Sequence, residues 1–415
     1  MNLAQPCCAW LAALAFSASG CGRLSYVAVP QDVALAGFDA NQDTGPLVDA
    51  FFFRDVTVDA GPRVPTFGIR SGIDHSCALL RGALACVGTN NEGQLGLGDV
   101  AARAVLTPVE AHPWVDVAAG YSATCARTYF GEVFCFGANN EGQLGVGDTT
   151  RRTLPVQVQL PEPIAQLSLA FDHACVIQHN GALHCWGANF EGQLGQDDEE
   201  PGVIAHAPVA VAPALTFTNV SAGQGHTCAV ASGGALYCWG RNTSCELGLV
   251  PAVRQLRVPT RIGTARYRSV AAGQSQTCAI TLEGRLACWG ADEDADGDAG
   301  PGGLASSSLI AAPTQIDART GWSEVSTDTF HTCAIFSDGT LHCWGRNREG
   351  QLGLGDSSIQ HQTPTQVGTD TDWIHIGVGR FYTCAQKRDA SVWCTGSLPM
   401  MPSDGQMNRS TFIQI

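Results

Sequence analysis

The sequence is poor in basic residues, in aromatic residues and in long apolar runs. Only 23 Lys and Arg face 38 Asp and Glu, giving a formal net charge of −15. Binding to a nucleic-acid backbone needs clustered Lys and Arg, so this charge balance argues against a nucleic acid as the main partner. Aromatic residues make up 7% of the chain, and no apolar segment is long enough to cross a bilayer.

Signatures of catalysis are also missing. The chain contains no G-x-S-x-G, no H-E-x-x-H, no Walker loop and no dinucleotide fingerprint. It has 18 Cys but no C-x-x-C, the spacing typical of zinc sites and redox motifs. So many cysteines outside that spacing favour disulfides formed in an oxidising compartment. We therefore expect an exported protein that binds rather than catalyses.

The N-terminus supports export. Residues 7–19 form an apolar stretch too short to span a bilayer, and Ala18-Ser19-Gly20-Cys21 follows it. This ending resembles a bacterial lipobox, in which the Cys is lipidated and begins the mature protein. We predict a signal peptide over 1–21 with a lipid anchor on Cys21, and a periplasmic or cell-surface location. A plain secretory signal, giving a secreted protein, is the alternative because no Lys or Arg precedes the apolar run.

Beyond the leader the chain divides into a spacer and a repetitive body. Residues 22–62 mix Asp, Gly, Pro and Val without a stable period, which predicts a flexible linker. In residues 63–415 a unit with two cysteines recurs, for example as DHACVIQHNGALHCWG and FHTCAIFSDGTLHCWG. The first cysteines follow one another at intervals of 48, 50, 53, 50, 55 and 51 residues. A period near 50 with several short strands per unit predicts an all-β, seven-bladed β-propeller.

Each cysteine pair marks a predicted β-hairpin with a disulfide. In the sixth unit Cys333 faces Cys343 and Ile335 faces Leu341, while Ser337-Asp338-Gly339 forms the turn. Facing residues of neighbouring strands meet the distance that a disulfide requires. Paired metal ligands are a poor alternative because no second pair lies beside each one at finger-like spacing. The predicted pairs are Cys77 with Cys86, Cys125 with Cys135, Cys175 with Cys185, Cys228 with Cys238, Cys278 with Cys288, Cys333 with Cys343 and Cys384 with Cys394.

Two further strands precede each hairpin. One ends in a small-residue turn, as in WVDVAAG (114–120), and the other is an edge-type strand with Pro near its start, as in TPVEA. We expect four strands per blade. The first unit begins at FGIRSG (67–72) with no edge strand before it, and TFIQI (411–415) ends the chain alone. This pattern predicts that the C-terminal strand closes the ring by joining both termini in one blade.

The units resemble the RCC1 (regulator of chromosome condensation) repeat over most of 63–415. The matching motif is H-[ST]-C-A-x6-G-x-L-x-C-W-G followed by N-x-E-G-Q-L-G-x-G-D. Its second half stands as NNEGQLGLGD (90–99), NNEGQLGVGD (139–148), NFEGQLGQDD (189–198) and NREGQLGLGD (347–356). The resemblance implies a propeller. The founding member is a nuclear exchange factor for a small GTPase and binds nucleosomes, but an exported acidic chain meets neither partner. We therefore expect no exchange-factor activity.

The recurring His and Trp residues are expected to be scaffold. Equivalent positions in different blades are spread round a ring and do not converge, so hydrogen bonding between blades is favoured over metal ligation for the histidines. The tryptophans after the second Cys are expected to pack blade against blade. These residues are His75, His173, His226, His331, Trp186, Trp239, Trp289 and Trp344.

Two departures from the repeat are candidates for a site. The D-x-D-x-D-G stretch of the fifth unit resembles the start of a calcium loop, but Gly303 stands where a Glu ligand is needed. A solvated loop without a cofactor is the alternative to a Ca²⁺ site at Asp292, Asp294, Asp296 and Asp298. Cys245, in the loop of the fourth unit, has no partner in the repeat. It is either a free thiol or a link to another chain.

We predict a non-catalytic binding scaffold on the bacterial cell envelope, a monomer whose propeller loops recognise an unidentified protein or glycan. The period stretches to 53 and 55 residues at the segments 196–213 and 291–312, which are the hypothetical specificity loops. The alternatives are a secreted enzyme or enzyme inhibitor that uses the propeller face, and a structural envelope or adhesion module. An apolar pocket with convergent polar groups at the channel mouth would favour an enzyme, and an aromatic patch on one face would favour binding.

Overall fold

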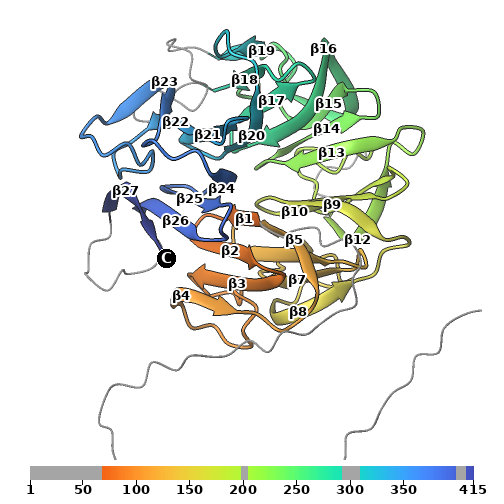
Figure 1. Cartoon of the computed structure of the whole chain (residues 1–415). Coiled ribbons are helices and arrows are strands. Elements are labelled where there is room, and N and C mark those ends of the chain that lie inside the picture. The colour runs from red at the N-terminus through yellow and green to blue at the C-terminus, as the bar shows by residue number, and fades with distance from the viewer. Residues whose placement is uncertain (1–67, 198–203, 292–308, 399–407) are drawn as a thin grey trace, which may run out of the picture. The chain divides into compact units, whose positions relative to one another are not determined.

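The computed structural model describes residues 68–197, 204–291, 309–398 and 408–415, and every regular element in them is a β-strand. Successive antiparallel sheets form seven blades around a central channel (Figure 1). The seven-bladed all-β propeller expected from the repeat is confirmed.

Each blade contains four strands in chain order. The first strands, which line the channel, are β1 (Gly68–Ser71), β5 (Trp114–Ala119), β9 (Ile164–Leu169), β13 (Phe217–Ala222), the second half of β16 (Gln255–Ala272), β20 (Trp322–Thr327) and β24 (Trp373–Val378). The second strands are β2 (His75–Leu80), β6 (Ala123–Thr128), β10 (His173–Gln178), β14 (His226–Ala231), β17 (Gln276–Thr281), β21 (His331–Phe336) and β25 (Tyr382–Lys387). The third strands are β3 (Ala83–Gly88), β7 (Val133–Gly137), β11 (Leu183–Ala188), β15 (Ala235–Arg241), β18 (Leu286–Gly290), β22 (Leu341–Arg346) and β26 (Val392–Ser397). The fourth strands are β4 (Arg103–Pro108), β8 (Arg152–Val158), β12 (Ile204–Val211), the first half of β16, β19 (Ile310–Gln315), β23 (Gln360–Gln366) and β27 (Asn408–Gln414).

Strand β16 belongs to two blades. Its first half pairs with β15 and its second half, from Tyr267 onward, pairs with β17. Blades four and five therefore share one seven-stranded sheet, so the seven blades form six sheets. Elsewhere a short connection separates one blade from the next.

The hairpin register agrees with the expectation. Cys333 pairs with Cys343 and Ile335 with Leu341, and Gly339 in the turn has a φ of +84°. In the first blade the shorter turn has positive φ at both Arg81 and Gly82, as a two-residue hairpin turn requires.

A disulfide joins the two hairpin strands of every blade, and the pairs are the seven that the repeat predicts. All fourteen of these cysteines are fully buried. Each disulfide therefore crosslinks neighbouring strands inside the hydrophobic core. The disulfides link Cys77 to Cys86, Cys125 to Cys135, Cys175 to Cys185, Cys228 to Cys238, Cys278 to Cys288, Cys333 to Cys343 and Cys384 to Cys394.

We expected each edge strand to belong to the hairpin that follows it in the sequence, and this is wrong. Each edge strand belongs to the hairpin that precedes it. The edge strand β4 pairs with β3 of the preceding hairpin, and not with the strand that follows it at Trp114. Distance along the chain is a misleading guide to strand pairing here. Only a few residues separate β4 from the first strand of the next blade, whereas a long loop separates β4 from its own hairpin. The loop returns the chain to the outer edge of the same sheet, where β4 completes the hydrogen-bonded ladder.

The expected composite closing blade is therefore also corrected. The C-terminal strand β27 pairs with β26, with Ile413 opposite Cys394, and so completes blade seven rather than blade one. It does lie at the closing junction of the ring. Ile413 and Ile415 pack against the buried cluster that joins blade seven to Ile69 and Val87 of blade one. Closure thus depends on contacts between blades seven and one, and not on a blade shared by both termini.

The hydrophobic core is divided into clusters between neighbouring blades. Cys333 and Leu341 pack against Trp373 and Ile376 of blade seven. Residues of the opposite face of the same hairpin, such as Trp344, pack against blade five. Alternation along each strand sends side chains to both faces of the blade, and each face is covered by a neighbour.

Candidate functional site

The central channel is a cavity of about 290 Å³ lined by the first strands of the blades. The turns between first and second strands surround one end of it, which we call the channel mouth. These turns, called the mouth face, are 72–74, 120–122, 170–172, 223–225, 273–275, 328–330 and 379–381.

Most polar side chains of the channel wall bond to the next blade. The amide oxygen of Gln166 accepts from the backbone N–H of Val220 at 3.0 Å. The amide oxygen of Asn219 does the same for Val270 at 2.8 Å. The hydroxyls of Ser168, Ser221 and Ser326 accept in the same way from the next first strand. Since these side chains satisfy backbone donors at the inner edge of each sheet, they are scaffold and not a catalytic constellation.

The end of the channel away from the mouth carries paired charges. The guanidinium of Arg70 lies 3.5 Å from Glu324, whose other oxygen accepts from Nδ1 of His375 at 3.0 Å. Burial alone raises the pKa of Glu324, but the bond from His375 and the charge of Arg70 hold it below its usual value. Burial raises the pKa of Asp116, although Arg70 and Arg127 oppose the shift. Every charge here has an opposite charge nearby.

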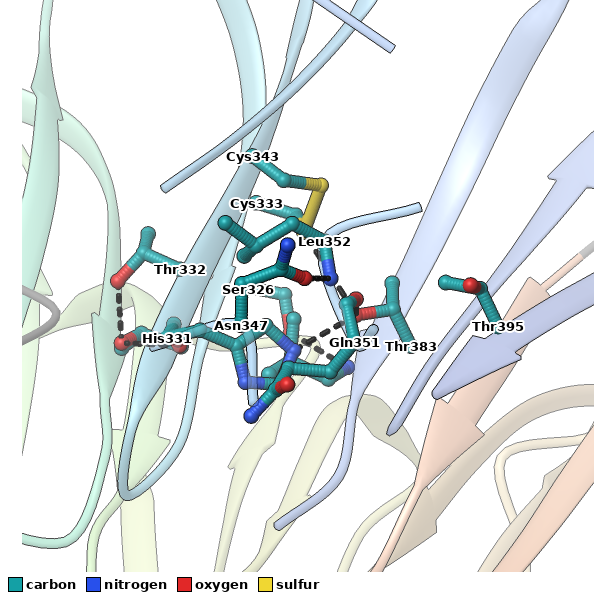
Figure 2. Close-up of a disulfide and its surroundings, with 12 residues drawn as sticks. Ser326, His331, Thr332, Cys333, Cys343, Asn347, Gln351, Leu352, Thr383 and Thr395 are labelled. Carbon is teal, nitrogen blue, oxygen red and sulfur yellow. Dashed lines mark hydrogen bonds between the residues drawn. A yellow bond between two sulfur atoms is a disulfide. The ribbon is translucent and has the colours of Figure 1, made fainter. Parts of the chain in front are cut away.

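The predicted hydrogen bonds between blades are present at all four histidines. Nε2 of His331 lies 2.7 Å from the hydroxyl of Thr383 on the next blade, and this hydroxyl donates to the carbonyl of Gln351 (Figure 2). Burial lowers the pKa of His331 to about 3, so the ring is neutral. The same bond to a Thr of the following blade, at 2.8–2.9 Å, is made by His75, His173 and His226.

Loops between the third and fourth strands bind each blade to the next. We call these the inter-blade loops, and they contain the N-x-E-G-Q-L-G motif or its equivalent. In the loop of blade six, the amide oxygen of Asn347 accepts from the N–H of Leu352 (Figure 2). Its amide nitrogen donates to the carbonyl of Ser358 at 2.9 Å. The Asn therefore closes the loop on itself and holds the backbone that receives Thr383.

The recurrent spacing of Trp and Gly in the repeat has a steric cause. The indole N–H of Trp186 donates to the carbonyl of Gln143 in the preceding inter-blade loop at 2.9 Å. A Cβ on Gly145 would lie 2.6 Å from the same ring, so only Gly fits there. Trp239 and Trp289 repeat the hydrogen bond, which supports the expected packing role.

Cys245 is a free cysteine and is buried. Burial raises the pKa of its thiol, and Glu246 adds to the shift. A fully buried thiol offers no atom to another chain, which favours the free-thiol alternative over the intermolecular one.

Four sequence candidates fall partly or wholly outside the described residues. Cys21 and the four aspartates of the expected Ca²⁺ loop lie outside them, as do portions of the loops 196–213 and 291–312. Within the described residues, no three His, Cys, Asp or Glu side chains gather as metal ligands. No helix that could cross a membrane occurs in that part of the chain.

Sequence reasoning missed the aromatic side chains of the mouth face. Tyr121 and Phe171 contact each other with ring centroids 4.8 Å apart, and both line the cavity. Phe330 and Phe381 stack at 5.4 Å on the other side of the ring. The guanidinium of Arg380 lies 5.1 Å from the centre of the Phe381 ring. Their place in the repeat could have revealed them, because each of these residues occupies the turn between the first and second strands of its unit.

Antiparallel blades around a central channel, each with one disulfide, define a disulfide-linked β-propeller. Comparisons with known proteins show the family. A family model described as "RCC1-like domain" matches residues 37–385. The Ultraviolet-B receptor UVR8 of Arabidopsis thaliana is 31% identical over 341 residues, covering 79% of this chain and 77% of UVR8. The chain belongs to the RCC1-like family.

Solved structures agree at the level of the fold. Human WBSCR16 superposes with a TM-score of 0.70 at 18% identity, covering 80% of this chain and 93% of that one. Prp20p of Saccharomyces cerevisiae superposes with a TM-score of 0.70 at 18% identity, covering 85% of this chain and 86% of the other. The seven buried disulfides set an additional condition on this member, since they indicate folding in an oxidising compartment.

Proposed function

We propose that the chain is a non-catalytic binding scaffold of the bacterial cell envelope, and that its mouth face recognises a protein partner. One observation carries this: partly exposed aromatic rings gather in the turns around the channel mouth. Tyr121 is 44% exposed, and Phe171, Phe330 and Phe381 are half-buried. Aromatic and Arg side chains are the residues that dominate binding at protein interfaces.

The channel wall away from the mouth favours binding over catalysis. Its Gln, Asn and Ser side chains are engaged in bonds between blades, and its paired charges hold one another. A general base or nucleophile needs a free side chain within reach of a substrate. The wall residues would break blade contacts if they were used in this way.

A capture experiment with matched variants tests the face. The oxidised chain is immobilised, and proteins and glycans from envelope extracts of the source organism are bound and identified. Phe381→Ala is expected to weaken capture of the partner by roughly 30-fold or more, as for an aromatic anchor. Phe130→Ala is the matched control, because Phe130 is 67% exposed in a turn between the second and third strands. Loss of capture with Phe130→Ala alone, or capture of a glycan only, would contradict the proposal.

The envelope location follows from the predicted leader and has its own test. Cell fractionation is expected to find the wild-type chain with membranes, and Cys21→Ser is expected to release it in soluble form. Wild-type chain found in the soluble fraction would instead favour a plain secretory signal.

A further inference from the structure

Position 328 breaks a steric rule of the repeat. The equivalent residue, the first of each mouth-face turn, is Gly in five blades and Ala170 in the third. A Cβ on Gly120 would lie 2.0 Å from the carbonyl oxygen of Ala170, and one on Gly223 would lie 2.5 Å from that of Gly273. The neighbouring blade thus normally fills this space. Blade six nevertheless has Asp328 at this position, and Asp328 lines the channel cavity.

The carboxyl group of Asp328 has only local partners among the described residues. The hydroxyl of the adjacent Thr329 lies 3.5 Å away, and the backbone N–H of Thr329 also donates to it. Arg380 is near enough to lower its pKa, but the two groups form no ion pair within the described part of the chain. Burial outweighs this influence and raises the pKa of Asp328 to about 7.

The two ends of the channel therefore differ in their charges. At one end Glu324 forms an ion pair with Arg70 and a hydrogen bond with His375. At the mouth Asp328 lines the cavity without an ion-paired cation among the described residues, and the rings of Tyr121 and Phe171 line the same cavity. A departure from the repeat that adds a carboxyl group without an ion-paired cation among the described residues is expected at a functional position.

We propose that the channel mouth is a socket for the cationic side chain, Lys or Arg, of a loop on the partner protein, with Asp328 as its counter-ion. This rests on the proposed function, since it names the chemistry that the mouth face recognises.

Size and charge fit this occupant. The cavity of about 290 Å³ lies at the lower limit of small-molecule pockets, so it suits one side chain better than a drug-sized ligand. The net charge of −15 attracts a cationic partner during encounter. The carboxylate of Asp328 supplies a charge-assisted hydrogen bond to the cation, and the aromatic side chains of Tyr121 and Phe171 line the same cavity.

The repeat itself offers the variant that tests the socket. Asp328→Gly restores the residue of five other blades while it removes the carboxyl group. Because the folded state disfavours the charged carboxylate above the unfolded pKa of 3.8, this variant is expected to unfold at the same temperature as wild type or a higher one at neutral pH. Asp328→Asn keeps the size of the side chain. Asp172→Gly, in the mouth-face turn of blade three, is the matched control.

The probes are N-acetyl-arginine methylamide, N-acetyl-lysine methylamide and, as a neutral control, N-acetyl-norleucine methylamide. Titrations followed by NMR are expected to show saturable binding of both cationic probes, at least a tenfold weakening with Asp328→Gly and Asp328→Asn, and no change with Asp172→Gly. Equal binding of the norleucine probe, no saturable binding of either cationic probe, or a stable Asp328→Gly variant with unchanged affinity would each overturn the proposal.

The outcome separates this socket from the broader function. If Asp328→Gly still captures the partner while Phe381→Ala does not, the socket is wrong and the mouth face is still the binding surface. If neither variant affects capture, the assignment of binding to the mouth face fails as well.

Discussion

The junction between blades six and seven and the junction between blades seven and one hold the ring with different chemistry. In the first, Nε2 of His331 lies 2.7 Å from the hydroxyl of Thr383, under the inter-blade loop of blade six (Figure 2). In the second, the phenol of Tyr382 donates to the carbonyl of His75 at 2.7 Å and lies 3.1 Å from that of Gly72. The first bond uses an imidazole, which binds a proton in mild acid only when the chain unfolds, whereas the second uses a phenol, which does not bind one in that pH range.

This difference indicates that the stability of the histidine junctions depends on pH in the acid range, whereas that of the closing contact at Tyr382 does not. Burial raises the pKa of Tyr382, which moves its titration further from neutrality. At the closing junction Gln386 adds a bond to the carbonyl of Leu79. Burial lowers the pKa of four inter-blade histidines, to about 4 for His75 and about 3 for His173, His226 and His331.

Acidification is expected to have the largest effect. A histidine with a lowered folded pKa stabilises the fold fully above the unfolded pKa of 6.5, and loses that stabilisation as pH falls toward the folded value. At about pH 5 each of the four histidines would cost on the order of 2 kcal/mol. Urea unfolding at several pH values between 7 and 4.5 measures this loss. The slope of the unfolding free energy against pH should approach the value for uptake of four protons on unfolding.

Two variants assign the acid response to a junction. His331→Gln mimics Gln276 of blade five, which donates to Thr332 of the next blade, and is expected to reduce the slope by about one proton. Tyr382→Phe is expected to leave the slope unchanged. An equal slope in wild type and His331→Gln would show that the acid response arises elsewhere.

Removal of disulfides is the next largest effect and should not distinguish the junctions. Cys333–Cys343 and Cys384–Cys394 both close loops with a sequence separation of 10. Replacing either pair by Ala is expected to lower the free energy of unfolding by about 2–3 kcal/mol, which urea unfolding measures. A much larger loss for one pair would mean that its disulfide also determines how that junction packs.

Asn347→Ala would weaken only the first junction. Asn347 is 5% exposed, and its loss leaves the N–H of Leu352 without its acceptor. We expect a loss of about 2 kcal/mol in the free energy of unfolding. The exposed Asn91, at the second position of the same motif in blade one, is the control, and Asn91→Ala should change stability little.

Tyr382→Phe tests the closing junction alone. It retains the buried ring but leaves the carbonyls of Gly72 and His75 without the phenol donor. The expected loss is about 1 kcal/mol by thermal or urea unfolding at pH 7. A loss near zero would indicate that packing of Ile69 and Val87 is sufficient to close the ring.

Lys387→Met should have the smallest effect, since Lys387 pairs with a half-exposed aspartate and makes no hydrogen bond or ion pair to the strands of a neighbouring blade among the described residues. Its ammonium lies 4.8 Å and 5.0 Å from the centres of the Trp373 and Trp393 rings, and 2.7 Å from Asp370. Met keeps an apolar side chain beside the two rings, and the Asp370 partner is half-exposed. Removal of the charge is therefore expected to lower the free energy of unfolding by about 0.5 kcal/mol. Fluorescence-detected unfolding follows it directly through the two tryptophans.

Particular residues show how far the sequence predicted the fold and the site. Equal spacing within each unit predicted the pairing of Cys333 with Cys343 and the inter-blade role of His331, because both depend on local register and on repetition. The sequence misplaced TFIQI, since an edge strand carries no mark of which neighbour it will pair with. Asp328 was overlooked because its departure from Gly has meaning only once the next blade is seen to fill that space.

The sequence by itself determined the class of fold, the number of blades and the seven crosslinks, because turn chemistry and alternation act over a few residues and recur seven times. Only the tertiary structure decided how strands are grouped into blades, how the ring closes and which side chains surround the channel mouth. These features depend on contacts between residues about 50 to 300 positions apart, where packing and burial, rather than local pattern, select the arrangement.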